Sequence, residues 1–434
     1  MVEVDTIRAM IPRDGGSYDV VVAGGGPAGI GAAVAAARTG AKTLLLEARP
    51  HLGGVASTAL WMPMNRLVTA GRPRGGVHDL FLAKMKSYGP DAYREGKRNF
   101  VDDDGFDFHP DYLRLGLLEL LEESGCDYRL YSPVTGVDKS GDSVVGVRSA
   151  YKGGESAFAC RVAVDATGDG DVAAAAGVEM VRGHEEDPKF MPISLVFAVS
   201  GVDVDRLEAY MAESQDGFRR TIEAAKADGY ATAAWYAFDR ATVPGVVSVN
   251  NGGPAAVSGL YGGEPADLTL VERLGISVAV DFVSIARDRA IPGLERCSLV
   301  RTGAAVSVRN TRRIAGEYEV TVEDAREGTD FVDVVARKYG VIDANQIFIG
   351  EMQSGFGYPY RAMVPRRIDN LLAAGRCGSA TFLGHAAGKS MGNMMGLGQA
   401  AGVAAAVSAH DGVPPRRVNV ARVQEILRGM NVSL

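Results

Sequence analysis

The chain has 434 residues, of which 47% are hydrophobic and 23% are charged, and its formal net charge is −7. This length predicts two or three domains with large cores. The net negative charge argues against a general affinity for nucleic acid or anionic membranes, so we expect neither as a partner. The 55 glycines follow no short period, which argues against a collagen-like or low-complexity chain.

The four cysteines stand far apart, without a C-x-x-C pair. A disulfide-exchange centre or a zinc site therefore has no support, and we expect no bound metal. The first residues carry acids and lack the basic and apolar regions of a secretory signal. Apolar runs such as AAGVAAAVSA are too short to span a bilayer. We expect a cytoplasmic protein.

Residues 18–47 have the pattern of a βαβ unit, after a lead-in of residues 1–17 that we expect to be flexible. The run YDVVVA, which begins at Tyr18, predicts a buried parallel strand, and GGGPAG predicts a turn. IGAAVAAARTG then predicts a helix, and AKTLLLE predicts a second strand. From residue 51 to about 107 the pattern is irregular, which indicates excursions around a ligand.

The remaining pattern predicts an interrupted domain. Residues 109–124 predict a helix with a proline near its start, and 127–137, 143–151 and 155–168 predict a three-stranded meander that rejoins the first sheet. Residues 179–346 mix strands and helices, so we expect a second, mixed α+β domain there. The run NLLAAGRC and a helix at 396–409 return the chain to the first domain. The predicted fold class is therefore α/β, with a discontinuous Rossmann-type domain of residues 18–178 and 347–434.

The spacing Gly24-x-Gly26-x-x-Gly29 gains weight from its position between a predicted strand and helix. Gly24 permits a tight turn, Gly26 lets the backbone approach a pyrophosphate, and Gly29 allows close helix–strand contact. The first amides of the helix would hold the phosphate charge. Glu47, at the end of the next strand, would accept hydrogen bonds from a ribose. The alternative is a glycine-rich turn without a ligand.

Four stretches of the chain resemble the FAD-dependent oxidoreductase family of the glutathione-reductase-like flavoproteins. These stretches are GGGPAGIGAAVAAARTGAKTLLLEARPHLGG, VDATGDGDVAAAAG, VRNTRRIAGEYEVT, and PYRAMVPRRIDNLLAAGRC followed by GLGQAAGVAAA. They occur in the family's order, and the similarity extends from Tyr18 to Ala409. The resemblance implies that FAD, rather than NAD, is the cofactor, that the discontinuous domain binds it, and that residues 179–346 form the substrate domain.

The resemblance also implies which residues contact FAD. The set lies in the first turn and helix, after the second strand, at the start of the meander, after its last strand, and in the two carboxyl-terminal motifs. It comprises Gly24, Gly26, Pro27, Ala28, Gly29, Glu47, Ala48, Arg49, Gly54, Val55, Val134, Ala166, Thr167, Gly168, Gly375, Arg376, Gly396, Leu397 and Gly398. GLGQAAGVAAA would start a helix whose amino end stabilises reduced flavin. Simple packing of a small-residue helix is the alternative.

Three residues are candidates for catalysis. His385 lies between two cofactor motifs and could take a substrate proton, although a structural hydrogen bond is an alternative. Lys389 competes with it for this role. If VSVRNTRRI is a strand, Arg309 and Arg313 share one face and could clamp a substrate anion; an ion pair between domains is the alternative. The family's Arg-Glu-x-Arg-Arg stands here as Arg309-Asn310-Thr311-Arg312-Arg313.

These features predict an enzyme that transfers a hydride between a small organic substrate and flavin N5, as a dehydrogenase or oxidase with an unknown electron acceptor. A flavin monooxygenase or an NAD(P)H-driven reductase is an alternative, although no second G-x-G-x-x-G fingerprint is present. A halogenase is disfavoured, because Trp61 and Trp235 stand apart and no W-x-W-x-I-P run exists. A redox-sensing flavoprotein without catalysis is an alternative of another class.

Overall fold

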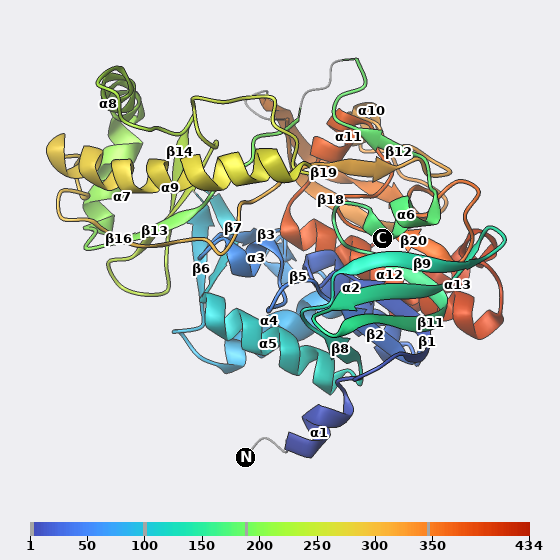
Figure 1. Ribbon diagram of the computed structural model, residues 1–434. Helices are drawn as coiled ribbons and strands as arrows, with labels where there is room; N and C mark the ends of the chain where they lie inside the picture. The colour runs from blue at the N-terminus through green and yellow to red at the C-terminus, as the bar shows by residue number, and fades with distance from the viewer. Residues whose placement is uncertain (1–3, 99–101, 187–189, 345–347) are drawn as a thin grey trace.

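The computed structural model describes residues 4–98, 102–186, 190–344 and 348–434. The helices are α1 (Val4–Ala9), α2 (Pro27–Arg38), α3 (Val55–Thr58), α4 (Val77–Ser87), α5 (Pro110–Glu123), α6 (Asp171–Ala176), α7 (Val204–Glu213), α8 (Gln215–Ala227), α9 (Pro265–Asp288), α10 (Val322–Glu327), α11 (Phe382–Ala386), α12 (Met391–Asp411) and α13 (Val420–Gly429). Figure 1 shows how they are arranged around the sheets. None of the helices in the described part of the chain has the length and apolar character that a membrane crossing requires.

The strands of the main sheet and its neighbours alternate with these helices. They are β1 (Gly16–Ala23), β2 (Thr43–Leu46), β3 (Met64–Asn65), β4 (Val68–Thr69), β5 (Arg72–Pro73), β6 (Tyr93–Arg98), β7 (Asp102–Phe108), β8 (Asp127–Arg129), β9 (Val134–Ser140), β10 (Ser143–Tyr151), β11 (Gly154–Asp165), β12 (Met180–Arg182), β13 (Phe197–Ser200), β14 (Tyr236–Arg240), β15 (Val247–Asn251), β16 (Ser298–Thr302), β17 (Arg312–Ile314), β18 (Val334–Asp343), β19 (Phe348–Pro359) and β20 (Leu371–Ala373).

The main sheet has the order β8-β2-β1-β11-β10-β9, and β20 pairs with the end of β11. The pairings β8–β2, β2–β1, β1–β11 and β11–β20 are parallel, whereas β9, β10 and β11 form an antiparallel meander. The predicted Rossmann-type α/β fold with a meander is confirmed. The segment predicted as the first meander strand is two strands, because the chain turns at Tyr131 with a positive φ of 54°. Its first part, β8, pairs with β2 on the opposite edge of the sheet.

Both faces of β1 are covered, which explains its continuous apolar sequence. Val20 and Val22 belong to the core that contains α2 and α12. Val21 belongs to a separate core on the other face, together with Val172 of α6. The alternation of side chains along the strand therefore feeds two cores.

The smaller part of the molecule is a four-stranded antiparallel sheet, in the order β14-β15-β13-β16, with α7, α8 and α9 beside it. Its core is a cluster of its own that runs from Phe197 to Cys297. The hairpin of β18 and β19 packs differently: Val335 and Phe356 belong to the same core as α2 and α12. The predicted domain boundaries stay a prediction. The lead-in holds helix α1, and the carbonyl of Met10 accepts from the backbone N–H of Tyr128 at 3.1 Å.

Helix α12 begins earlier than the sequence predicted. Its first residue is Met391, with Ser390 as N-cap, so the expectation that the helix starts at Gly396 is wrong. The first turn packs onto neighbouring backbone, because a Cβ on Gly392 would lie 2.3 Å from the carbonyl oxygen of Arg66. Gly396 and Gly398 therefore lie inside the helix and not at its amino end.

Helices α2 and α12 cross with their backbones in contact. A Cβ on Gly398 would lie 1.8 Å from the carbonyl oxygen of Ala28, and a Cβ on Gly402 would lie 2.1 Å from that of Ala32. Side chains are absent from these positions because none would fit. The crossing holds the amino ends of both helices in fixed positions.

Gly398→Ala should lower the free energy of unfolding by about 1–3 kcal/mol or more, since the added methyl group must push two buried backbones apart. Gly429→Ala is the matched control: nothing lies within 4 Å of its Cβ position at the end of α13, so it should be neutral or stabilise by up to about 1 kcal/mol. Urea unfolding of the three proteins measures the difference. Equal stabilities for both variants would contradict the close crossing.

Candidate functional site

The turn between β1 and α2 uses its glycines in two ways. Gly24 has a φ of +97°, and a Cβ there would lie 2.5 Å from the carbonyl oxygen of Ala166. A Cβ on Gly29 would lie 1.7 Å from the carbonyl oxygen of Gly24. Gly26 differs from both, because its backbone is extended and no atom lies within 4 Å of its Cβ position. Gly26 therefore borders open space at the amino end of α2.

Glu47 lies beside this turn at the end of β2. Its carboxylate accepts from the backbone N–H groups of Gly25, at 2.6 Å, and of Arg49, at 2.8 Å. Burial raises the pKa of Glu47 despite these two hydrogen bonds. A carboxylate has about four acceptor positions, so Glu47 keeps the capacity to accept from a hydroxyl group of a ligand. Ala48 continues the same loop.

Two further segments frame the same space. Gly54 lies against the turn, since a Cβ on it would lie 3.1 Å from the Cα of Gly26, and Val55 begins α3 directly after it. Val134 begins β9, two residues after Ser132, whose backbone N–H donates to the carbonyl of Glu47 at 2.8 Å. The predicted residues 54, 55 and 134 are therefore brought towards Glu47.

The loop after β11 is held by the buried carboxylate of Asp165. That carboxylate accepts from the Thr167 hydroxyl at 2.7 Å and from the Ala173 backbone N–H at 2.9 Å, and burial raises its pKa to about 6. Ala166 continues the sheet, with its N–H bonded to the carbonyl of Ala23 at 2.8 Å. The loop thus lies at the carboxyl end of the parallel strands, where open α/β sheets bind ligands.

Gly168 and the turn after β20 meet across this loop. A Cβ on Gly168 would lie 2.6 Å from the guanidinium of Arg376, and one on Gly375 would lie 2.9 Å from the Cβ of Ala28. Arg376 donates to Asp169 at 3.1 Å. Its Nη1 is buried and has no partner among the residues that the structure describes.

These observations fit FAD. The open space at Gly26, the first amides of α2 and the free lone pairs of Glu47 suit a pyrophosphate and a ribose. The turn at Gly375 reaches the same helix, since a Cβ on Gly375 would lie 2.9 Å from the Cβ of Ala28. Pro27 opens α2 and needs no hydrogen-bond partner for its nitrogen.

The sequence matches the FAD dependent oxidoreductase family over residues 19–427. The chain belongs to this family. It is an enzyme and its cofactor is FAD, as the resemblance implied. The contacts of single residues with FAD stay a prediction.

Curated relatives of the oxidoreductase match shorter stretches. A digeranylgeranylglycerophospholipid reductase of Picrophilus torridus is 32% identical over 140 residues, which cover 30% of this chain and 34% of the relative. One from Methanococcoides burtonii is 28% identical over 200 residues, covering 44% and 47%. The matched stretch thus spans a third to a half of these relatives. A 3-oxosteroid 1-dehydrogenase of Mycolicibacterium smegmatis is 41% identical over 73 residues, covering 16% of the chain and 12% of the relative.

Solved structures share the fold. A geranylgeranyl bacteriochlorophyll reductase-like protein of Thermoplasma acidophilum has a TM-score of 0.51 at 15% identity, with 96% of this chain and 84% of that chain covered. The myxobacterial chondrochloren halogenase has a TM-score of 0.51 at 15% identity, with 95% and 79% covered. Identities this low show the shared fold alone.

In the oxidoreductase, His385 is 5% exposed on α11, and its Nε2–H donates to the carbonyl of Arg309 at 3.2 Å. Burial, with the nearby charges of Arg313 and Lys338, holds the pKa of His385 well below its usual range. The ring is therefore neutral at physiological pH.

Residues 306–314 do not form a continuous strand, and only Arg312–Ile314 is extended as β17. Arg309 precedes β17, and its guanidinium donates to the carbonyl of Pro192 at 2.7 Å and lies 5.7 Å from the ring of Trp235. In this irregular segment the side chain of Asn310 accepts from the backbone N–H of Met191 at 2.7 Å. Arg309 therefore packs against residues 192 and 235. Its side chain does not share one strand face with that of Arg313.

Lys389 forms an ion pair with Asp343 at 3.1 Å, and it also donates to the carbonyl of that residue. Leu397 and Gly396 lie in the second turn of α12, where a Cβ on Gly396 would lie 3.4 Å from the ring of His78. Gly398 lies at the contact between α2 and α12. A cofactor role for these three residues of α12 stays a prediction.

Sequence reasoning missed a buried polar group around the start of α12. Arg74 donates to the side chain of Asn393 at 2.7 Å, and burial lowers its pKa to about 10. His78 donates from Nε2 to the carbonyl of Gly392 at 2.8 Å, and burial lowers its pKa to about 3. Lys338, on β18, is also buried. None of the three lies in a recognisable motif, so no local signal could have found them.

Gly26→Val should leave the apoprotein folded, because no protein atom lies near its Cβ position and the backbone there is extended, but it should prevent FAD from loading. Absorbance at flavin wavelengths and the melting temperature of the apoprotein measure the two effects. Wild-type FAD content in the variant would show that the pyrophosphate does not approach this glycine.

Proposed function

We propose that this oxidoreductase dehydrogenates a small organic molecule with an apolar body, at a C–O, C–N or C–C bond. FAD supplies the hydride acceptor when bound, so the protein must bind and orient the substrate and manage its protons. The observation that carries the proposal is a cavity of about 780 Å³ in the smaller part of the molecule. This volume is typical of a small-molecule site.

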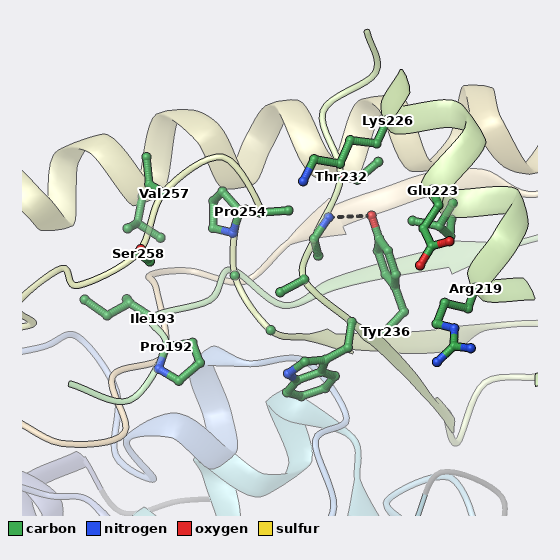
Figure 2. Close-up of a pocket in the computed structure, with 18 of the residues that line it drawn as sticks. Pro192, Ile193, Arg219, Glu223, Lys226, Thr232, Tyr236, Pro254, Val257 and Ser258 are labelled. Carbon is green, nitrogen blue, oxygen red and sulfur yellow. Dashed lines mark hydrogen bonds between the residues drawn. The ribbon is translucent and has the colours of Figure 1, made fainter. Parts of the chain in front are cut away.

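The cavity has an apolar floor and a charged rim. Buried Phe218 and Ile222 of α8 line it together with Trp235. Arg219 and Glu223 line its rim, and they are exposed. Figure 2 shows these charged side chains on α8, and it shows the hydroxyl of Tyr236 accepting from a backbone N–H across the cavity. An apolar body fits the floor, with a polar group at the rim.

The inner wall of the cavity is connected to the cofactor motifs through Arg309. Pro192 and Trp235 line the cavity, and both contact the guanidinium of Arg309. The carbonyl of Arg309 holds His385, in the segment between the turn at 375–376 and α12. This chain of contacts supports entry of the substrate from the cavity towards the flavin.

We propose that His385 acts as a neutral hydrogen-bond acceptor for the substrate. Its Nε2–H is committed to Arg309, which leaves Nδ1 as the acceptor of the neutral ring. Reduction of a substrate C=C bond is the second candidate function, favoured by the similarity to the two digeranylgeranylglycerophospholipid reductases.

A substrate of the proposed class should bleach the FAD of the purified enzyme under anaerobic conditions. Panels of hydroxy, amino and saturated carbonyl compounds with apolar bodies are the probes, and NADH and NADPH are compared at the same concentration. If NADPH alone bleaches the flavin and an unsaturated lipid then reoxidises it, the proposed function would be reduction of a C=C bond and not dehydrogenation. Retention of the oxidised spectrum with every probe would favour a sensing role.

The cavity is tested with a matched pair of variants. Ser258→Trp should fill the cavity mouth and raise the KM of the bleaching compound at least about tenfold, with FAD content unchanged. Ala256→Trp places the same ring on an exposed neighbour that does not line the cavity and should leave KM as in the wild type. Equal KM values for the two variants would exclude the cavity as the substrate site.

His385→Gln should slow flavin reduction by the bleaching compound by about 10²-fold, because the positioned acceptor is lost. The loss should be the same from pH 6 to 9, since the pKa of His385 lies well below this range and the ring stays neutral throughout it. Stopped-flow absorbance, with FAD content as control, measures the rate. A rate near that of the wild type would show that the role of His385 is structural.

A further inference from the structure

Lys338 carries a buried amine on β18, and the residue is 3% exposed. Its Nζ lies 5.5 Å from the ring centre of Phe356 and 5.9 Å from that of Tyr358. Within the described ranges of the chain, no hydrogen bond or ion pair to this Nζ is found. A buried ammonium without a partner is costly, so its retention requires a reason.

Three of the basic groups around Lys338 each have a carboxylate. Lys389 pairs with Asp343 at 3.1 Å, and Arg376 pairs with Asp169 at 3.1 Å. Arg313, the third cation of the group, pairs with Glu185 at 3.2 Å. Arg74 has no carboxylate among the described residues, but its guanidinium donates to the carbonyls of Arg66 and Arg337 and to the side chain of Asn393. Lys338 has neither a counter-ion nor such hydrogen bonds within the described part of the chain. Burial, together with the charge of Lys389, lowers the pKa of Lys338 to about 7.

The position of Lys338 connects the two carboxyl-terminal cofactor motifs. On one side its neighbour Tyr358 reaches the turn after β20, since a Cβ on Gly378 would lie 2.6 Å from the Tyr358 hydroxyl. On the other side a Cβ on Gly388 would lie 3.1 Å from the Cβ of Lys338, and the Gly388 carbonyl accepts from Asn393 in the first turn of α12 at 3.0 Å.

The amino end of α12 is itself prepared for negative charge. The helix has 21 residues, and its N-cap Ser390 makes no capping hydrogen bond. The Ser390 hydroxyl is buried and has no partner among the residues that the structure describes. An uncapped helix amino end attracts anions through its free N–H groups and its dipole.

We propose that Lys338 is the counter-charge of reduced FAD, a neutral amine beside the oxidised cofactor that becomes an ammonium when the cofactor turns anionic. In this step FAD receives two electrons with one proton, as a hydride, and acquires a negative charge. The lone pair of Nζ then forms an N–H bond with a proton from solvent, so the net charge of the pair stays constant. The inference needs bound FAD, and it does not depend on the substrate or direction proposed above.

The groups near Lys338 whose pKa is shifted by burial titrate outside the range of pH 6 to 9. The pKa of His385 lies well below its usual range, and burial raises that of Tyr358 above its usual value. Burial lowers the pKa of Arg74 only to about 10. The remaining neighbours are the paired cations Lys389, Arg376 and Arg313.

The test is the midpoint potential of bound FAD from pH 6 to 9, measured by equilibration with redox dyes in the full chain loaded with FAD. Lys338→Met should have a lower potential than the wild type below about pH 7, where the wild-type lysine is charged in both redox states. As pH rises above about 7, the wild-type lysine loses its proton in the oxidised enzyme, and the gap between the two proteins should close.

Lys338→Arg should keep the gap to Lys338→Met open at every pH, because arginine stays charged. Lys389→Met should move the closing of the gap to higher pH, since it removes the charge that lowers the lysine pKa. Lys42→Met is the matched control. It removes the same positive charge from an exposed lysine that lies 4.7 Å from the ring of Tyr18, where solvent screens the charge, so the midpoint potential should not change. Lys338→Gln replaces Lys338→Met if the latter does not load FAD.

A gap between wild type and Lys338→Met that does not vary with pH would overturn the proposal, as would a potential of Lys338→Arg as low as that of Lys338→Met. Because dyes reduce the flavin, the outcome is independent of the substrate search. If no substrate is found but the difference in potential between wild type and Lys338→Met varies with pH, only the proposed function is contradicted.

Discussion

The contact between the backbones of α2 and α12 is the constraint on which both halves of the site depend. Gly398 and Gly402 let α12 lie directly on the carbonyls of Ala28 and Ala32. Any side chain there would separate the helices, and the two amino ends would move apart with them. One end faces the open space at Gly26, and the other lies beside Lys338 and Asn393. A single glycine-dependent crossing thus sets the distance between the turn at Gly26 and the buried polar group around the start of α12.

The elements that the sequence predicted correctly are those whose signal is local. The βαβ unit at 18–47 combines apolar strands, a glycine turn and an alanine-rich helix within thirty residues, and the structure has each element where the pattern indicated. Helix α5 was equally clear, with Pro110 at its first position and His109 as N-cap. The start of α12 was missed because its first turn depends on packing of Gly392 against the backbone of residue 66, a contact that no local pattern records.

The environment of the individual charged side chains was less predictable, because it depends on neighbours that are distant in sequence. The sequence offered Lys389 as a candidate for a substrate proton. Its ammonium instead pairs with Asp343, which lies 46 residues away in the sequence. Lys338 lies in a strand, and the local sequence does not distinguish a buried lysine there from one that faces solvent. Its burial follows only from the packing of Phe356 and Tyr358 around it. Side-chain chemistry of this kind is set by tertiary structure, and a motif search cannot find it.

Residues 309–313 join the cavity wall to the cofactor loop within one short segment. Arg309 binds the carbonyl of Pro192 on the cavity side, while the hydroxyl of Thr311 donates to Asp169 at 2.7 Å on the cofactor side. Arg376 donates to the same carboxylate of Asp169. A regular strand through this segment would point alternate side chains to two fixed faces and could not serve both contacts with these spacings. The irregular backbone of this segment is therefore what allows it to contact both Pro192 in the cavity wall and Asp169 in the loop after β11.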